Sequence, residues 1–301
     1  MNQQILEQLK TLTTENINPN STNIDILPTI EKLRIINNED QHVALIIAQE
    51  LPAIAAAVDA ITFAMKHGGR LIYTGAGTSG RLGILDAVEC PPTYGVDYNT
   101  VVGLIAGGAE AFIKAQEGVE DKENLGIADL QSINLTSQDI VCGIAASGRT
   151  PYVIGGLNYA RSLGCKTIAI ACNKNSVIGQ HADLKIEVAL GAEVVTGSTR
   201  MKAGTAQKLI LNMLSTASMI SLGKVYKNLM VDVKTSNAKL EARAKKIIMD
   251  ATEVDYITAE KYLQLANNHV KTAIVMILNQ VDFTNAQTKL INANGIIRNI
   301  I

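Results

Sequence analysis

The stretch Arg70-Leu-Ile-Tyr-Thr-Gly-Ala-Gly-Thr-Ser-Gly80 decides the fold that we predict for this chain. Residues Arg70 to Tyr73 form a short apolar run that is typical of a buried strand, and the glycine-rich loop Gly75 to Gly80 comes directly after it. A helix is expected from about Ser79 to Cys90, with Pro91-Pro92 ending it. A strand, a glycine loop and a helix in this order indicate one unit of a parallel sheet covered by helices.

Two further loops are also built from small and hydroxyl residues. Ala146-Ser-Gly-Arg-Thr150 follows a predicted strand from Asp139 to Ala145, and Gly197-Ser-Thr-Arg200 comes later in the chain. Both precede helical runs, which begin at Pro151 and at about Met201. Proline suits the first turn of a helix, where its missing N–H costs nothing. Because the carboxyl ends of parallel strands meet at one edge of a sheet, we expect the loops to build one pocket.

The remaining patterns complete an α/β fold. Further strands are predicted at 100–106, 166–172 and 184–188, and further helices at 109–118 and 122–133. Continuous runs rich in β-branched residues are typical of strands that are buried on both faces. The sequence therefore predicts a parallel five-stranded sheet flanked by helices.

The two ends of the chain differ from this central part. Residues 1–40 are polar and contain Asn18-Pro19-Asn20-Ser21, which favours a loose arm, whereas Asp40 to Lys66 has the spacing of one or two helices. After about Asn228 the patterns are helical, at 237–251, 255–266 and 271–278, with a shorter helix near the C-terminus. We predict three parts: an N-terminal arm at 1–40, a sheet domain at 41–225 and a C-terminal helical domain at 226–301.

Composition argues against several classes of protein. The chain has 301 residues, 47% of them apolar, and a formal net charge of −1, without the basic runs that nucleic-acid binding needs. The longest apolar runs, such as Ile46 to Ala57, are interrupted by polar residues and a proline, so no membrane span is expected. Residues 1–10 lack a secretory apolar core, and no two cysteines form a C-x-x-C pair. A cytoplasmic protein with reduced thiols is therefore expected.

The loops are suited to an anionic ligand. Glycine lets the backbone approach a ligand closely, and a helix N-terminus offers unpaired N–H groups and a partial positive charge. Hydroxyl donors are available at Thr78, Ser79, Ser147 and Thr150. A single loop of this kind is as typical of an ordinary helix cap as of an anion-binding site. Two such loops on neighbouring strands favour an anion site.

Other ligands and chemistries fit less well. The first loop also matches the dinucleotide pattern G-x-G-x-x-G, but the next strand ends in Leu104-Ile-Ala-Gly-Gly108, without the acidic residue that such a site expects. Ser79 does not fit the G-x-S-x-G pattern of serine hydrolases. The four histidines are scattered without metal-ligand spacing, so no metal site is expected.

Long stretches of the chain resemble one family. Leu71-Ile-Tyr-Thr-Gly-Ala-Gly-Thr-Ser-Gly-Arg-Leu-Gly-Ile-Leu-Asp-Ala-Val-Glu-Cys-Pro-Pro-Thr-Tyr-Gly95 is nearly the signature of the N-acetylmuramic acid 6-phosphate etherases, which contain a sugar-phosphate-binding SIS domain. Further matches lie at 143–152, 193–208 and 228–233, and at Thr14-Glu15 with the following Asn18-Pro19 and Ile24-Asp25. The resemblance covers essentially the whole chain and implies a SIS domain at 41–225.

The resemblance implies a lyase that removes the D-lactyl ether from C3 of N-acetylmuramic acid 6-phosphate. The products are N-acetylglucosamine 6-phosphate and D-lactate, and the reaction belongs to recycling of peptidoglycan sugars in the bacterial cytoplasm. In the open-chain sugar, C2–H lies next to the aldehyde, so a positioned carboxylate can remove it. The lactyl oxygen then leaves with a proton, and water adds back at C3. One base and one acid suffice, so no cofactor is expected.

The resemblance assigns the acid to Glu89 and the base to Glu120. From the residues alone, Glu120 lies in an acidic run where most carboxylates are solvated. Glu89 lies on an otherwise apolar helix face, where a lone carboxylate has a raised pKa that suits a general acid.

The position of Glu89 poses a geometric problem. It lies about ten residues past the first loop, or roughly 15 Å along a helix. Glu89 therefore reaches the pocket only if the helix is shortened near Gly83 or if a partner subunit meets it there. Because SIS domains commonly pair, we expect a homodimer with sites near the subunit interface.

The substrate-binding residues are expected to come from the three loops and from one further carboxylate. Ser147 and Thr150 are preferred for the phosphate over Arg149, Arg200 and Lys202, which are equally suited to surface salt bridges. Glu193 is assigned to the substrate, with catalysis as its alternative role, because related sugar isomerases carry a glutamate just before the equivalent helix. The complete set is Thr78, Ser79, Ser147, Arg149, Thr150, Glu193, Ser198 and Thr199.

Two other functions use the same loops. A non-catalytic regulator that responds to sugar phosphates would keep the hydroxyl residues and could lose the two glutamates. An aldose-ketose isomerase would use the same C2 deprotonation but needs no acid for a leaving group. The presence of both Glu89 and Glu120 favours the etherase.

Overall fold

The computed structural model describes residues 13–233 and 238–301. The expectation about residues 1–10 and the first residue of the helix predicted at 237–251 lie outside the described residues. The chain forms two compact units. The first comprises the described residues up to Ala87 together with 99–214, and the second comprises Val88–Tyr98 and the described residues from Ser215 onward.

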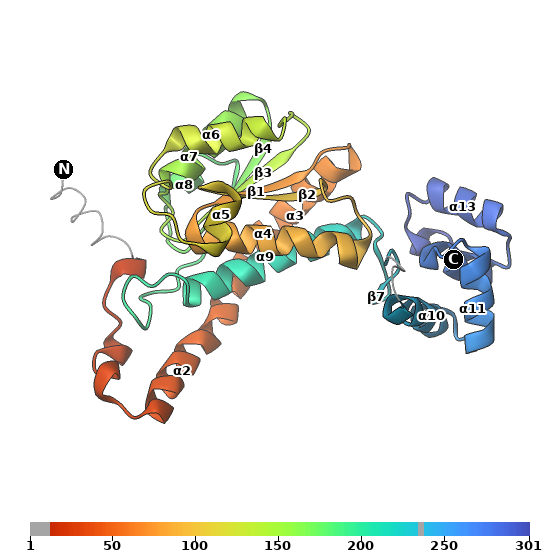
Figure 1. Ribbon diagram of the computed structural model, residues 1–301, viewed down its shortest axis with the longest axis horizontal. Helices are drawn as coiled ribbons and strands as arrows, with labels where there is room; N and C mark the ends of the chain where they lie inside the picture. Colours follow the sequence, from red (N-terminus) through yellow and green to blue (C-terminus); the bar gives the residue numbers. More distant parts are fainter. Residues whose placement is uncertain (1–12, 234–237) are drawn as a thin grey trace. The chain divides into compact units, whose positions relative to one another are not determined.

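The first unit contains the predicted five-stranded sheet (Figure 1). All neighbouring strands pair in parallel, in the order β2-β1-β3-β4-β5, which confirms the predicted fold class. Buried apolar residues run continuously through β1 and β3, as expected for strands covered on both faces. The strands are β1 (Leu71–Gly75), β2 (Val101–Ile105), β3 (Ile140–Ala145), β4 (Lys166–Ala171) and β5 (Leu184–Glu187).

Helices cover both faces of this sheet. Tyr152, Val153 and Leu157 of α7 (Pro151–Ser162) pack with Leu130 of α6 (Glu123–Ser132) on one face. Figure 1 shows α6 and α7 on this side and α4 (Gly77–Tyr94) on the other. The other helices of the first unit are α3 (Leu51–Lys66), α5 (Gly108–Ile113), α8 (Val177–Gln180) and the first part of α9 (Lys202–Ser221).

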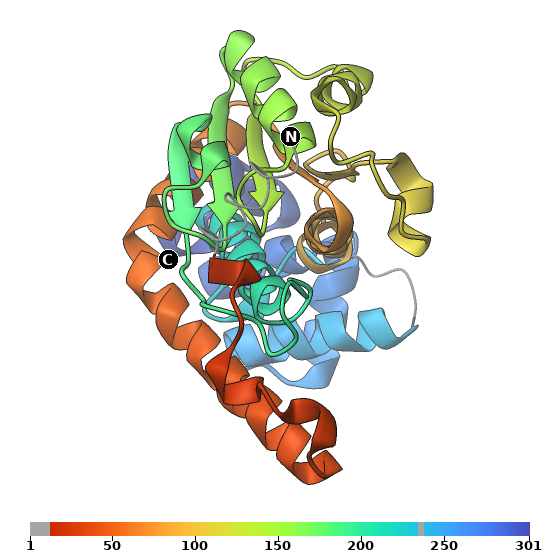
Figure 2. The same cartoon turned by 90° about the vertical axis from the view of Figure 1, so that its left-hand side faces the viewer.

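The N-terminal region is more regular than its composition indicated. Three short 3-10 turns, Thr13–Glu15, Pro19–Ser21 and Ile24–Ile26, precede α2 (Thr29–Ile47). The expectation of a loose arm up to residue 40 is therefore wrong for the described residues. Turn Ala48–Glu50 joins α2 to α3, and α2 extends away from the sheet in both views (Figures 1 and 2).

The second unit is mainly helical. Helices α10 (Ala238–Thr252), α11 (Tyr256–Leu265) and α12 (Val270–Asn279) agree with the predicted runs, and α13 (Phe283–Asn292) is the expected shorter helix. A final 3-10 turn spans Ile297–Asn299. These elements share an apolar core that includes Ile248, Leu263 and Ile274.

Three local predictions were wrong. Pro91 and Pro92 lie inside the last turn of α4, where the fixed φ of proline is compatible with a helix, although the N–H donors are lost and the rings crowd the preceding turn. Helix α5 ends at Ile113, well before the predicted Gly118. A two-stranded antiparallel hairpin, β6 (Val225–Tyr226) with β7 (Leu229–Met230), was missed because two-residue strands are too short to give a periodic pattern.

One described helical run is long and apolar enough to cross a membrane by length and composition. It spans Thr29–Lys66, and its most apolar 18-residue window has a mean hydropathy of 1.7 and is 28% buried. This run differs from the expectation, drawn from the polar residues and proline that interrupt Ile46 to Ala57, of no membrane span. A single run of this kind is weak evidence for a membrane span, because helices of water-soluble proteins meet the same criteria.

Candidate functional site

The first two glycine loops start side by side at the carboxyl edge of the sheet. Strands β1 and β3 are neighbours, and their register pairs Gly75 with Ile144. Loop 1 (Gly75–Gly80) leads from β1 into α4, and loop 2 (Ala146–Thr150) leads from β3 into α7. The two helix N-termini therefore begin beside each other, as the sequence predicted from the parallel topology.

Loop 3 (Gly197–Arg200) is connected to loop 1 through the start of α9. The Ser79 hydroxyl donates to Oε1 of Gln207 over 3.0 Å, and both side chains are buried. The Thr78 methyl group lies 3.5 Å from the position that a Cβ would occupy at Gly204. Three loops that are far apart in the sequence therefore converge at one edge of the first unit.

Two glycines give these loops their shape. Gly77 has a φ of +53°, and a Cβ added there would meet no atom within 4 Å, so space is open above loop 1. Gly148 has a φ of +75°, and a Cβ there would lie 2.5 Å from the Cβ of Ser176. Only glycine meets both requirements at position 148 without strain.

The hydroxyl residues of loops 2 and 3 are partly accessible. Ser147 and Thr150 are half-buried, as are Ser198 and Thr199. Thr150 occupies the N-cap position of α7, but its side chain makes no capping hydrogen bond. Its hydroxyl is therefore available to a ligand at the start of the helix. Arg149 is also half-buried, whereas Arg200 is exposed.

Glu193 is fully engaged with the first turn of α9. Its two carboxylate oxygens accept hydrogen bonds from the backbone N–H groups of Lys202 and Ala203, over 3.0 and 2.9 Å. Burial raises the pKa of the Glu193 carboxyl, and these N–H groups offset only part of that effect. The geometry gives Glu193 a role in holding α9 and loop 3, and its assignment to the substrate stays a prediction.

Lys202 is also occupied inside the protein. Its side chain is 5% exposed, pairs with Glu39 of α2 and donates to the carbonyl of Leu190 over 3.2 Å. This ammonium group therefore ties α2 to the segment after β5. The contacts agree with the preference for hydroxyl residues over Lys202 at the phosphate.

Glu120 lies next to loop 2. Its backbone carbonyl accepts a hydrogen bond from the N–H of Tyr152 over 2.9 Å, in the first turn of α7. The Glu120 side chain is half-buried. This hydrogen bond holds Glu120 beside Tyr152, which is two positions after Thr150 in the sequence.

Glu89 lies on α4, 12 residues after its first residue, Gly77, which corresponds to roughly 18 Å along the helix axis. The helix is continuous, so the suggested shortening near Gly83 does not occur. The Glu89 side chain is exposed. The described residues therefore do not surround it with the apolar groups that the sequence led us to expect.

Sequence reasoning missed the residues that hold the loops together. Asn173 follows β4 at the same sheet edge and donates to the carbonyl of Ala146 over 3.2 Å. Gln207 joins loop 1 to α9 through Ser79. The position of Asn173 after a predicted strand was a usable signal, whereas Gln207 lies within a helix and gave none.

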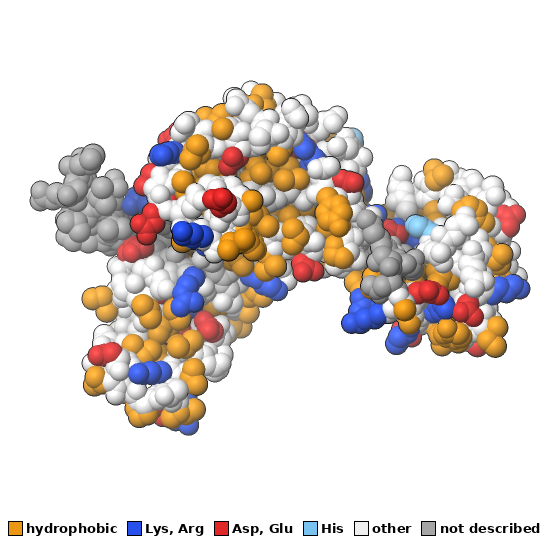
Figure 3. Space-filling view, viewed as in Figure 1, with side chains coloured by type: hydrophobic (Ala, Val, Ile, Leu, Met, Phe, Trp, Pro, Cys, Tyr) orange, Lys and Arg blue, Asp and Glu red, His pale blue; other side chains and the backbone are white. Residues whose placement is uncertain are grey.

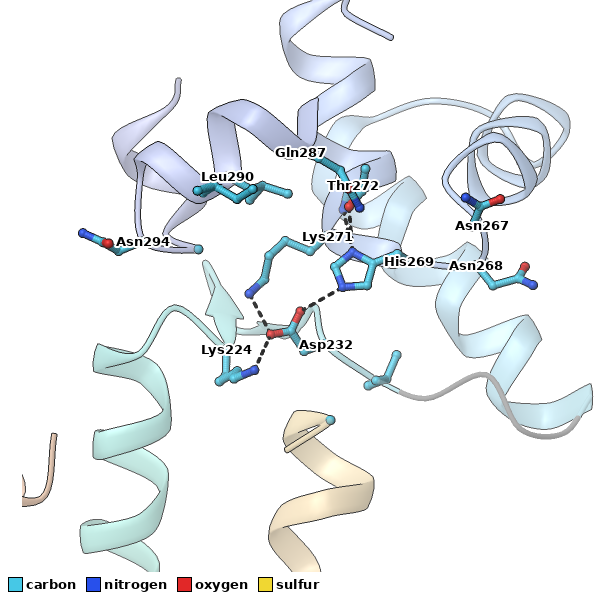
Figure 4. A pocket seen from close by; sticks show the side chains of 14 residues that line it. Lys224, Asp232, Asn267, Asn268, His269, Lys271, Thr272, Gln287, Leu290 and Asn294 are labelled. Atoms are coloured by element: carbon cyan, nitrogen blue, oxygen red, sulfur yellow. Dashed lines mark hydrogen bonds and ion pairs between the residues drawn. The ribbon is translucent and has the colours of Figure 1, made fainter. Parts of the chain in front are cut away.

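A separate cavity of about 840 Å³ lies within the second unit (Figure 4). Lys271 and Lys224 lie 2.7 and 3.0 Å from Oδ2 of Asp232, and Nε2 of His269 lies 3.9 Å from Oδ1. Burial lowers the pKa of Lys271, and the Asp232 charge opposes this shift. The cluster joins the segment after β7 to the start of α12, and we assign it a structural role.

Family models match the centre of the chain. The model described as the glucokinase regulatory protein N-terminal SIS domain matches residues 53–161, and the model described as the SIS domain matches residues 120–217. A phosphoheptose isomerase from Francisella tularensis has a TM-score of 0.50 and 17% identity, and the alignment covers 64% of this chain and 100% of that chain. This likeness supports the fold alone.

Several curated relatives match nearly the full chain and carry the name N-acetylmuramic acid 6-phosphate etherase. The relative from Geobacillus sp. is 58% identical over 96% of this chain and 98% of its own length. The relative from Francisella tularensis subsp. tularensis is 57% identical over 96% of this chain and 99% of its own. The relative from Colwellia psychrerythraea is 56% identical over 99% of this chain and 96% of its own.

Proposed function

Because the chain belongs to the N-acetylmuramic acid 6-phosphate etherase family, we propose that it cleaves the D-lactyl ether of N-acetylmuramic acid 6-phosphate. The products are N-acetylglucosamine 6-phosphate and D-lactate. The observation that carries this proposal is the identity of 56–58% to relatives of that name over nearly the whole chain. The convergence of three anion-type loops at one sheet edge supports a sugar phosphate as the ligand.

In the proposed site, the loops bind the 6-phosphate through hydroxyl and backbone N–H groups. Ser147 and Thr150 are the first candidates, because both lie at the N-terminus of α7 and the Thr150 hydroxyl does not cap that helix. Thr78, Ser79, Arg149, Ser198 and Thr199 complete the surroundings of the phosphate and the sugar. Glu193 supports the site by holding the start of α9.

The proposed chemistry is an elimination followed by an addition. The Glu120 carboxylate takes the proton from C2, and the C3–O bond breaks while Glu89 protonates the departing lactyl oxygen. This step leaves D-lactate and a 2,3-unsaturated aldehyde. The Glu89 carboxylate then takes a proton from water as its oxygen adds to C3, and Glu120 returns the proton to C2. Both glutamates regain their starting states, and the net reaction consumes one water.

We further propose a cytoplasmic homodimer in which a partner subunit brings Glu89 to the site. The continuous α4 supports this arrangement, because it carries Glu89 away from the loop on its own chain. Helix α2 adds support, since only Val43 and Ile47 of its 19 residues are buried, and several of its apolar side chains are exposed (Figure 3).

The test is release of D-lactate. The purified full chain is incubated with N-acetylmuramic acid 6-phosphate, and D-lactate is measured with a D-specific lactate dehydrogenase. We expect one D-lactate for each N-acetylglucosamine 6-phosphate formed. Binding of the sugar phosphate without D-lactate release would overturn the etherase in favour of a regulator. Formation of a ketose phosphate would favour an isomerase.

A further inference from the structure

The N-terminal strap, which we define as Thr13–Ser21, lies against two of the three loops. The sequence matched Thr14-Glu15 and Asn18-Pro19 to the family, but neither pair has a part in the function derived so far. In the structure, Thr14 and Asn18 of the strap are 1% and 4% exposed. Because these two polar side chains and that of Ser21 are buried, the strap is packed against the unit at three points along its length.

Asn173 joins the strap to loop 2. Its Oδ1 accepts hydrogen bonds from the Thr13 N–H over 2.9 Å and from the Thr13 hydroxyl over 2.8 Å. Its Nδ2 donates to the Thr14 hydroxyl and to the carbonyl of Ala146, both over 3.2 Å. The Asn173 residue is 4% exposed. One buried amide therefore fixes the strap and the start of loop 2 in a single arrangement.

The other end of the strap follows the segment that leads to loop 3. Nδ2 of Asn18 donates to the carbonyl of Ala192 over 3.2 Å, and the Ser21 hydroxyl donates to the carbonyl of Val194 over 2.8 Å. These two carbonyls flank Glu193, which holds the start of α9. The strap is therefore attached at both ends to backbone that shapes the candidate site.

Between these attachments, the strap presents a carboxylate to loop 3. Oε2 of Glu15 lies 3.2 Å from the position that a Cβ would occupy at Gly197, whose φ is +75°. A side chain at position 197 would therefore crowd this carboxylate. Glu15 is half-buried and adds a carboxylate beside loop 3, whose own side chains are the Ser198 and Thr199 hydroxyls and the exposed Arg200.

We propose that the strap is a part of the sugar-phosphate site, in which Glu15 recognises the sugar and Asn173 is a positioning residue for loop 2 and the strap. This inference rests on the proposed function. A carboxylate repels a phosphate dianion but accepts hydrogen bonds from sugar hydroxyls and from the N-acetyl N–H. Glu15 therefore distinguishes a sugar phosphate from a bare phosphate, whereas the loops bind the phosphate in both.

The test compares a sugar phosphate with inorganic phosphate in Glu15→Gln. The KM for N-acetylmuramic acid 6-phosphate and the Ki of inorganic phosphate are both measured from D-lactate release. We expect the KM to rise roughly 10–100-fold, which is the effect of weakening a hydrogen bond to a charged group. The Ki of phosphate is expected to stay within about twofold of the wild-type value, because phosphate lacks the sugar that Glu15 contacts. The kcat is expected to stay within about twofold as well, because the lost interaction stabilises the bound substrate and the transition state equally.

Glu31→Gln is the matched control, because Glu31 lies on α2 with its side chain 43% exposed and forms a salt bridge with Arg34 on the same helix. We expect it to change neither constant. A wild-type KM in Glu15→Gln would overturn the role of Glu15, and so would an equal rise in KM and in the Ki of phosphate. A wild-type protein that releases no D-lactate would instead overturn the proposed function, so the two failures are distinguishable.

Two further variants test the role of Asn173. Thr13→Val removes one donor to Asn173 and leaves its bond to loop 2, so the KM is expected to rise roughly 2–10-fold with little change in the Ki of phosphate. Asn173→Asp keeps acceptors for Thr13 but cannot donate to Ala146, so both constants are expected to rise together. Wild-type constants in Asn173→Asp, with an unchanged melting temperature, would overturn the positioning role.

Discussion

Glu193 and Glu120 differ in which of their atoms form hydrogen bonds within the protein. Both carboxylate oxygens of Glu193 accept backbone hydrogen bonds, whereas Glu120 is held through its backbone carbonyl. Among the described residues the Glu120 carboxylate has no hydrogen-bond or ion-pair partner, which supports its proposed role as the base. The two glutamates look alike in the sequence, and their hydrogen bonds set them apart.

The first prediction at this scale concerns Glu120→Gln, which keeps the shape of the side chain but removes the base. We expect D-lactate release and solvent deuterium exchange at C2 to fall together by about 10²–10⁴-fold, the usual contribution of a general base. Exchange is followed by NMR in deuterated buffer. Glu117→Gln, an exposed residue of the same segment, is the control. Exchange at the wild-type rate in Glu120→Gln would assign the base to another residue.

At the scale of elements, the two ends of the strands differ: the candidate ligand loops lie at the carboxyl ends, and a buried ion pair joins the amino ends of β1 and β3. The loops leave the carboxyl ends of β1 and β3, and the amino ends of the same strands are joined by Arg70 and Asp139. The Arg70 backbone N–H and guanidinium both donate to Asp139, and the shortest contact is 2.7 Å. The carboxylate side chain is 2% exposed. This pairing fixes the relative position of the two strands from which loops 1 and 2 emerge.

The second prediction is a pH-dependent loss of stability that depends on Asp139. Burial alone would raise the pKa of Asp139, but hydrogen bonds from Arg70 and Thr136 together lower it below the ordinary value of 3.8. A lowered pKa means that this carboxylate stabilises the fold fully above the ordinary value, and that the contribution is lost as the pH falls through the folded-state pKa. Asp139→Asn is expected to cost about 2–4 kcal/mol at pH 7.

The measurement is urea unfolding of both proteins between pH 7 and pH 3. The difference in unfolding free energy between wild type and Asp139→Asn is expected to narrow below about pH 4, because the carboxylate of the unfolded wild type begins to bind protons there while the native carboxylate, with its lowered pKa, remains ionised. A difference that stays constant over this range would show that Asp139 acts through packing rather than through its charge.

At the scale of the whole molecule, the open apolar face of α2 is the feature that calls for a partner. Ile30, Leu33 and Leu45 are 54%, 56% and 69% exposed. A helix with so few buried residues gains little stability from packing within its own unit, and a partner would cover these exposed side chains. A second copy of the chain is the partner that we propose.

The third prediction is that Leu45→Lys weakens the dimer. A lysine in an apolar interface must be desolvated, so we expect a monomer at micromolar concentration and a loss of etherase activity. Light scattering coupled to size-exclusion chromatography gives the mass. Ile257→Lys, at a 76% exposed position on α11, serves as the control. A dimeric Leu45→Lys protein would exclude this face from the interface.

Local patterns in the sequence were enough to predict the five strands of the main sheet and most of the helices, in their order. The sheet could be predicted from five apolar strands with glycine or proline residues in the flanking segments. This was possible because a parallel α/β fold repeats one local pattern. The strand that ends at Gly75 and the one that ends at Ala145 were both predicted to lead into ligand loops, and the register places them side by side. The family resemblance was also contained in the sequence.

Which distant residues share the sheet edge depends on the folded chain. Thr13 meets Asn173 across 160 positions, and Ser79 meets Gln207 across 128. Such contacts leave no periodic signal, because they depend on how the chain returns to the edge and not on the residues near each partner. Buried hydrogen bonds hold the N-terminal strap in place and bind Glu193 to the start of α9. Backbone geometry makes α4 continuous as far as Glu89. Both depend on the folded chain.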